Sequence, residues 1–548
     1  MNISRGIACL AFAAASAAFA AADGDVLARL QQAKNGETVV IPPGVYDVVR
    51  PIDVAGKTNL TVRGGRGVVI RLRFDPTNLS DPAVDGFRFR DCAGVTVEGL
   101  TMTTDRPVNC SGRVAAVDPE AGWYEVQVDP EFPVTGRERL QASETFDEHG
   151  VPDYVLEEWA WTGDRSAPGL AYELVAPQRL RVRTKLLKQL PKLKIGQSIL
   201  FRYWIYGNSV FRFDGCSDCA LRDIKIERSA SMAIRVHARS RNFTLERVNI
   251  RPPKGSAALF SGNADGINVT GLAGKLTVSD CHIRGLGDDA INVHCPATCV
   301  IGFDAATGRL RMQRVFRTKP VKMGPLWAAR GDVLAVYDPK TLAEIGRLRV
   351  KDYAESEAVV EVVSGRVEPG TVVFNDSMRP EILLRNCSFA ISRARGVLLR
   401  SRDMTVENCR FFGHALPGIL ITPDFRYWFE AGPSRNVVIR NCVFERCCNI
   451  RRKDNLGAVA VKCSDEGGVQ RLEPGVHRNI VIRDNLFRNC GSRGIFVAST
   501  LGVDVAGNRF EGNLPPQDDS PRDVDVRLLN CTDPAKRVWR DALGHVVD

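Results

Sequence analysis

The chain has 548 residues and a formal net charge of +10 at pH 7, from 74 lysines and arginines against 64 aspartates and glutamates. With 44% hydrophobic and 25% charged residues, its composition is that of a globular protein, which excludes a disordered or collagen-like chain. This length corresponds to about three domains or to one elongated repeat with insertions. The basic residues are dispersed and lack interleaved aromatic residues, so we expect no nucleic-acid partner.

The first 20 residues have the pattern of a signal peptide. Arg5 precedes an apolar stretch, and Ala18-Phe19-Ala20 forms an Ala-x-Ala cleavage site. No further apolar run reaches the ~18 residues of a membrane span, so we expect no membrane insertion. The sequence therefore predicts an exported protein, periplasmic or extracellular, whose mature chain begins near Ala21.

Short β-type segments follow the leader, with almost no helical pattern between them. Residues 25–33 are the exception and predict a helix that caps the first coil. Many segments end in Asn, Asp or Cys before an apolar residue, and examples end at Cys281, Cys387, Cys409, Cys442, Asn485 and Asn508. Successive members lie 22, 33 and 23 residues apart in the best-defined cases. Such a period, with two or three short strands per unit, indicates a solenoid.

The fold class predicted from this repeat is all-β, a right-handed parallel β-helix. Its coils would stack at about 4.8 Å, because no single coil can bury its own apolar face. A β-sandwich is the alternative, but its Asn-Gly and Asp-Gly hairpin turns are nearly absent. The recurring cysteines are interpreted as small buried ladder residues, and the 15 cysteines that follow the leader cannot all pair within one chain.

Two stretches interrupt the repeat and predict small inserted antiparallel β-domains, both barrel-like. Each contains alternating apolar segments but no coil motif. The predicted organisation is a signal peptide (1–20), N-terminal coils with a capping helix (21–111), a first insertion (112–205), coils with an acidic cluster (206–299), a second insertion (300–375), C-terminal coils (376–520) and a tail (521–548).

Two consecutive coils carry matched acidic turns. Asp265 and Asp289 each precede a small-Ile-Asn-Val segment and lie 24 residues apart, which is about one coil. We therefore expect them to stack at one corner, with Asp288 beside them. Three carboxylates this close repel one another when ionised, so at least one pKa should be raised. A protonated acid beside an ionised base is the pair that glycosidic hydrolysis requires. An aspartate ladder satisfied by backbone N–H groups, or a structural Ca²⁺ site, is the alternative interpretation.

These motifs carry a resemblance to known families. Asn263-Ala264-Asp265 with Gly287-Asp288-Asp289 resembles the acidic pattern of β-helical glycosidases such as the polygalacturonases of glycoside hydrolase family 28. The string from Gly287 to His294, the insertion after it, and residues 427–433 resemble glycoside hydrolase family 110 more closely. That resemblance implies a β-helix interrupted by two barrels and an exo-acting α-1,3-galactosidase, in some members active on the blood-group B antigen.

The resemblance also implies a mechanism, which is inverting, independent of a cofactor or metal, and carried by Asp265, Asp288 and Asp289. We expect Asp265 to act as the general acid and Asp288 with Asp289 to orient water as the base. The expected spacing of the aspartates conflicts with inversion. Carboxyl groups stacked at one strand spacing favour a retaining enzyme, because the carboxyl groups of inverting enzymes lie ~6.5–9.5 Å apart.

Further residues are candidates for binding the sugar. Trp428 and Glu430 lie in a long turn beyond the aspartates, where an aromatic face would pack on galactose and a carboxylate would accept hydroxyl hydrogen bonds. The others lie on strands beside the acidic turns: Asn268, Asn292, His294, Arg235 and His237. For the aromatic residues, packing within the loop is an equal alternative, and for each histidine a structural role is the more common one.

Three functions remain open at this point. The first is an α-1,3-galactosidase acting on galactose-terminated glycans. The second is a polygalacturonase-like hydrolase or a Ca²⁺-dependent polysaccharide lyase, although the Gly-His-Gly signature of polygalacturonases should follow the Asp pair within a few coils and the distant Gly413-His414-Ala415 is only a partial match. The third is a non-catalytic adhesin or glycan-binding module. The inserted domains offer contact surfaces for a homodimer.

Overall fold

A computed structural model describes residues 29–534, except 79–82, 161–167, 317–318, 322, 325, 426, 451–454, 466–467, 470–471 and 518–524. The predicted signal peptide and the start of the predicted capping helix lie outside these residues, and residues 29–32 are helical. No helix within the described ranges is long and apolar enough to cross a membrane.

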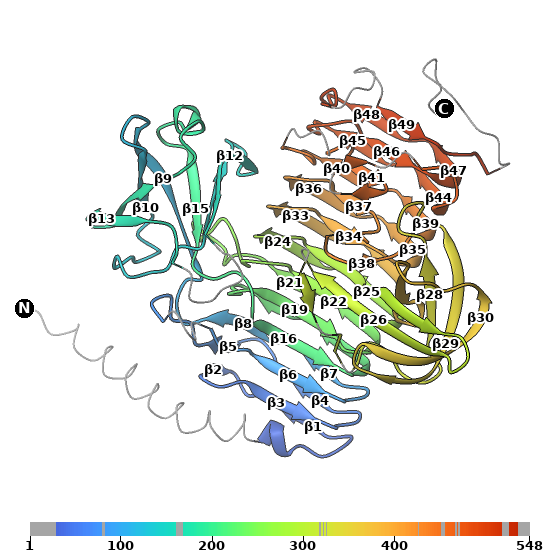
Figure 1. Cartoon of the computed structure of the whole chain (residues 1–548). Helices are drawn as coiled ribbons and strands as arrows, with labels where there is room; N and C mark the ends of the chain where they lie inside the picture. The colour runs from blue at the N-terminus through green and yellow to red at the C-terminus, as the bar shows by residue number, and fades with distance from the viewer. Residues whose placement is uncertain are drawn as a thin grey trace, which may run out of the picture.

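Three parallel sheets, here called A, B and C, run the length of the molecule (Figure 1). Sheet A consists of β1 (Thr38–Val40), β4 (Thr61–Arg63), β7 (Thr96–Glu98), β17 (Ser217–Arg222), β20 (Arg241–Glu246), β23 (Ala273–Ser279), β32 (Glu381–Arg385), β35 (Arg402–Glu407), β39 (Arg435–Arg440), β44 (His477–Arg483) and β47 (Thr500–Ala506). Sheet B consists of β2 (Gly44–Val48), β5 (Val68–Leu72), β8 (Thr101–Thr104), β18 (Lys225–Ile226), β21 (Asn249–Ile250), β24 (His282–Leu286), β33 (Ser388–Ser392), β36 (Arg410–His414), β40 (Val443–Glu445), β45 (Leu486–Arg488) and β48 (Arg509–Glu511).

Sheet C carries the candidate site at one end of its strands. It consists of β3 (Ile52–Ala55), β6 (Phe87–Arg90), β16 (Ser209–Asp214), β19 (Met232–His237), β22 (Ile267–Thr270), β25 (Ile291–Asp304), β34 (Val397–Leu399), β37 (Ile419–Ile421), β41 (Val459–Val461), β46 (Ile495–Ala498) and β49 (Val526–Leu529). Strand β49 continues the coils into the segment for which the sequence predicts a tail.

Identical side chains stack from coil to coil in the core. Phe411 and Phe444 are parallel at 4.8 Å between ring centroids, and Phe444 and Phe487 repeat this spacing. Cys281, Cys387, Cys409 and Cys442 are at most 3% exposed, and none of these four is in a disulfide bond. The stack follows from the repeat, because each coil places the same residue one strand spacing above the last.

Both interruptions of the repeat are antiparallel. The first is a seven-stranded sheet, here called the inserted sheet, in the order β12 (Pro152–Trp159), β11 (Ala142–Phe146), β15 (Ser198–Arg202), β9 (Asn109–Asp118), β10 (Trp123–Val128), β14 (Arg179–Arg183), β13 (Tyr172–Ala176), with the 3₁₀ turn η1 (Leu190–Lys192). The second is a closed six-stranded barrel in which β25 pairs with β26 (Arg309–Phe316), followed around by β30 (Glu357–Gly365), β29 (Glu344–Ala354), β28 (Val333–Tyr337) and β31 (Val372–Asn375), which returns to β25.

Short elements complete the structure. They are β27 (Lys319–Val321), β38 (Glu430–Ala431), β42 (Ser464–Asp465), β43 (Gly468–Val469) and the 3₁₀ turn η2 (Asp376–Met378). The predicted fold class, a parallel β-helix interrupted by two small antiparallel β-domains, is confirmed. The inserted sheet has β12 and β13 as edges, whereas the second insertion closes on itself.

Candidate active site

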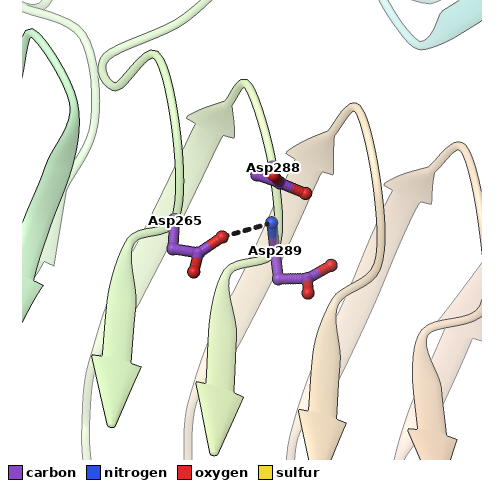
Figure 2. A group of neighbouring side chains, drawn as sticks. All are labelled: Asp265, Asp288 and Asp289. Atoms are coloured by element: carbon purple, nitrogen blue, oxygen red, sulfur yellow. Dashed lines mark hydrogen bonds between the residues drawn. The ribbon is translucent and has the colours of Figure 1, made fainter. Parts of the chain in front are cut away.

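The three aspartates converge as their spacing predicts. Strands β22 and β25 pair in parallel with Ile267 opposite Ile291, so the turns that precede them lie side by side. Figure 2 shows Asp265 on one turn and Asp288 with Asp289 on the next, with the backbone N–H of Asp289 donating to Asp265 Oδ1 at 3.3 Å. One carboxylate oxygen from each aspartate lies within 4.8 Å of the other two. Successive coils have therefore brought three acidic groups into one cluster.

The three carboxyl groups differ in their environments. Asp265 is 4% exposed, and burial together with repulsion from Asp288 and Asp289 raises its pKa well above that of an ordinary aspartate. Burial raises the pKa of Asp289 to about 6, against the opposing attraction of Arg395. Burial would also raise the pKa of Asp288, but Arg393 and Arg395 outweigh it, so this pKa is lowered. The cluster thus combines one carboxyl group whose surroundings favour the ionised form with another whose surroundings favour the protonated form.

Asp288 is held by residues that sequence reasoning missed. The Tyr206 hydroxyl donates to Asp288 Oδ2, and Arg393 Nη2 donates to Asp288 Oδ1 at 3.3 Å. Arg395 lies 3.1 Å from Asp289 Oδ1, and its backbone N–H donates to the same oxygen at 2.9 Å. A signal for Arg395 exists in the repeat, because it occupies the position of Asp289 in the next coil. The side chain of Asp288 keeps 16% exposure, so the cluster reaches the surface at this residue.

The inserted sheet supports both acidic turns from behind. Arg202 on β15 is fully buried and donates to the carbonyl oxygens of Asn263 at 2.8 Å and Gly287 at 3.1 Å, one on each turn. Its guanidinium also pairs with the buried Glu144 of β11. The guanidinium groups of Arg202 and Arg393 each lie over the ring of Trp159 of β12, at 4.5 and 4.6 Å from its centroid. This insertion, predicted only as a contact surface, therefore packs directly against the candidate site.

The predicted binding residues of sheet C form a continuous row beside the aspartates. Asn268 lies between Arg235 and Asn292 in the strand register, and its amide donates to Asp265 Oδ2 at 2.7 Å. His237 Nε2 lies 3.3 Å from Asn268 Oδ1, and Arg235 Nη2 lies 3.3 Å from His237 Nε2. Burial lowers the pKa of His237 to about 3, so this ring is neutral near pH 7.

His294, on the same strand as Asn292, and Glu430 of β38, which pairs with that strand, extend this row. His294 Nε2 lies 3.6 Å from Glu430 Oε1, and His294 Nδ1 lies 3.1 Å from Asn292 Oδ1. Burial lowers the pKa of His294 to about 4, so the contact with Glu430 is not an ion pair near pH 7. Burial would raise the pKa of Glu430, whose side chain is 15% exposed, but neighbouring positive charges, Arg400 among them, lower it. Sequence reasoning missed Arg400, although it directly follows β34.

Trp428 contacts other residues of its own turn. Its backbone N–H donates to Asp424 Oδ2 at 3.1 Å, and its ring meets Tyr427 edge-on at 5.0 Å. These contacts belong to the turn itself and match the alternative in which the aromatic residues pack the loop. A sugar-binding role for Trp428 remains a prediction.

Comparisons with known proteins agree with the fold and with the predicted resemblance. The family described as "Right handed beta helix region" matches residues 363–510. Alpha-1,3-galactosidase A of Bacteroides fragilis is 28% identical over 271 residues, which are 48% of this chain and 44% of that protein. Alpha-1,3-galactosidase B of Bacteroides thetaiotaomicron is 25% identical over 339 residues, 60% of this chain and 54% of that protein.

A longer match is found in a third relative. Alpha-1,3-galactosidase A of Shewanella woodyi is 24% identical over 439 residues, 77% of this chain and 70% of that protein. The chain spans about half the length of the first two relatives. The predicted resemblance to parallel β-helix glycosidases of the α-1,3-galactosidase type is thus confirmed, and the family 110 assignment fits the names of these relatives.

Proposed function

We propose that this protein is an exo-acting glycoside hydrolase that removes terminal α-1,3-linked galactose from glycans, such as blood-group B or linear Galα1-3Gal structures. One observation carries the proposal, the convergence of Asp265, Asp288 and Asp289 in environments that protonate one carboxyl and ionise another. The names of the relatives support the linkage and the sugar. We further propose that the protein is exported, as its leader predicts, and that it forms a homodimer.

In the proposed mechanism, the residue environments assign the roles. Asp265 retains its proton and donates it to the glycosidic oxygen as the bond breaks. Asp288 is ionised, is fixed by Tyr206 and Arg393, and removes a proton from the attacking water. Asp289 lies beside both and shares the orientation of that water. A cation is not needed to offset the charge of Asp288 and Asp289, because Arg393 and Arg395 already contact them.

The reaction is tested most directly by its products. We would incubate the purified protein with blood-group B trisaccharide, linear Galα1-3Gal and polygalacturonate, each with and without EDTA. Free galactose from the first two, unaffected by EDTA, is the expected result. Galacturonate release would instead indicate a pectin hydrolase, and an unsaturated, ultraviolet-absorbing product lost in EDTA would indicate a lyase. Glycan binding without any turnover would indicate an adhesin.

The stereochemistry is a separate question with its own measurement. Carboxylate oxygens within 4.8 Å of one another are closer than the ~6.5–9.5 Å usual for inverting pairs, whereas the resemblance to family 110 implies inversion. We propose inversion. Proton NMR of the first-formed galactose should then show the β anomer from an α-linked substrate, and the α anomer would contradict the proposal.

The assignment of Asp265 as the acid predicts a pH profile. The value of kcat/KM should fall toward alkaline pH as Asp265 loses its proton. Asp289→Asn removes one of the two negative charges that raise the pKa of Asp265. The alkaline limb of the kcat/KM profile should therefore move to lower pH, even if the variant is much slower than the wild type. Measurement of kcat/KM on Galα1-3Gal from about pH 4 to pH 9 for both proteins provides the test. An alkaline limb at the same pH in both proteins would contradict the assignment.

A further inference from the structure

A cavity lies apart from the aspartate turns, between the barrel and the C-terminal coils. It has a volume of about 760 Å³, which is within the range of small-molecule sites. Its barrel side includes Glu344 and Arg347, and its coil side includes Arg435 and Arg478. None of the candidate active-site residues lines it. The cavity is therefore a separate feature of the molecule.

The coil side of this cavity holds like charges in register. Arg435 on β39 lies directly opposite Arg478 on the neighbouring parallel strand β44, and Arg402 on β35 lies opposite Arg435 on its other side. Equal charges at paired positions of adjacent strands repel each other. Arg402 is compensated by Asp376 at 3.1 Å. Within the part of the chain that the structure describes, the side chains of Arg435 and Arg478 have no hydrogen-bond or ion-pair partner.

The carboxylates near this cavity are mostly engaged elsewhere. Glu344 is bound to Arg347 at 2.6 Å, and the buried Asp376 is bound to Arg379 at 3.1 Å as well as to Arg402. Glu473, an exposed side chain on the cavity wall, is the one acid there that makes no ion pair among the described residues. The cavity thus has a surplus of positive charge that the protein itself does not neutralise.

Buried polar atoms and apolar walls indicate what would fit. Ser434 lines the cavity, is 1% exposed, and its hydroxyl has no hydrogen-bond partner among the residues that the structure describes. The remaining surface includes Leu342 and Val476, which would pack on the carbon skeleton of a ligand. Guanidinium groups bind planar or tetrahedral oxyanions through paired N–H donors. We propose that this cavity binds a small molecule bearing a sulfate, phosphate or carboxylate group, held by Arg435 and Arg478.

The experiment measures binding by the full-length protein, independently of any hydrolysis. Calorimetry and thermal denaturation would be performed with inorganic sulfate, inorganic phosphate, galacturonate and galactose 6-sulfate, with galactose as the neutral probe and sodium chloride matching the ionic strength. We expect at least one anionic probe to bind saturably and to raise the melting temperature, while galactose and chloride do not. The anion that binds identifies the source of the ligand.

The variants are chosen from the same two strands. Arg435→Gln with Arg478→Gln should weaken the binding at least ~10-fold, because both guanidinium donors are lost. The matched control is Arg440→Gln with Arg483→Gln, which are also paired in register on β39 and β44 but lie at their other end, and which should bind as the wild type does. If the double variant does not fold, the single variant Arg478→Gln is used in its place, because the Arg478 side chain is exposed. The proposal is overturned if no anionic probe binds saturably, or if the cavity variant binds as tightly as the control.

Discussion

Asp265→Asn and Asp288→Asn should each lower the turnover of Galα1-3Gal by roughly 10²–10⁴-fold, the range that general acid–base catalysis contributes. Asparagine preserves the shape of each side chain but can neither donate the proton assigned to Asp265 nor accept the one assigned to Asp288. Steady-state kinetics on purified protein would measure the loss. Asp280→Asn is the matched control, because Asp280 is exposed on the coil of Asp288 and should leave turnover unchanged.

The stability of the Asp265→Asn protein distinguishes loss of chemistry from loss of fold. In the unfolded chain an aspartate has a pKa of about 3.9, whereas the folded protein raises the pKa of Asp265. Folding stability therefore falls as pH rises from the unfolded pKa toward the folded one. Asparagine does not ionise, so the variant should melt above the wild type at pH 7, with a difference that shrinks toward pH 4. An inactive variant that melts far below the wild type would indicate a structural role instead.

The sequence predicts the cluster because a parallel β-helix converts spacing into position. Asp265 and Asp289 lie one coil apart, and the observed pairing of Asn268 with Asn292 places their turns side by side. The same regularity predicts the buried cysteine ladder and the positions of the insertions. In such a repeat, the position of a residue along the stack depends only on the number of residues in each coil. One sequence is therefore enough to predict which residues lie side by side.

The residues that surround the cluster could not be predicted in this way. Tyr206 and Arg393 reach Asp288 from segments 82 and 105 residues away, and the second insertion separates Arg393 from Asp288 in the chain. Arg202 belongs to the inserted sheet, whose orientation on the β-helix depends on packing between non-repeating surfaces. No period relates Tyr206 or Arg202 to the aspartates. Of these surrounding residues, only Arg395 could be predicted from the sequence, because it occupies the repeat position of Asp289.

Arg202→Met should lower the free energy of unfolding by about 3–5 kcal/mol, the usual cost of removing one partner from a buried ion pair. Arg202 and Glu144 are both fully buried, and the variant leaves the carboxylate without its partner. Chemical denaturation would measure the change. Arg181→Met is the matched control, because Arg181 of the same sheet also contacts a tryptophan and pairs with Glu125, but its side chain is 34% exposed and Arg179 remains as a second partner of Glu125. Its loss should cost no more than about 1 kcal/mol.

A second substitution separates the ion pair from the support of the acidic turns. Adding Glu144→Gln to Arg202→Met removes the unpaired buried charge, so much of the lost stability should return. Turnover should not return, because the carbonyl oxygen of Asn263 still lacks the guanidinium donor that holds the Asp265 turn in register with the Asp288 turn. The double variant should therefore be stable yet slow, with kcat reduced more than KM is raised. Wild-type turnover in a folded Arg202→Met protein would contradict this role, since the inserted sheet would then contribute stability alone.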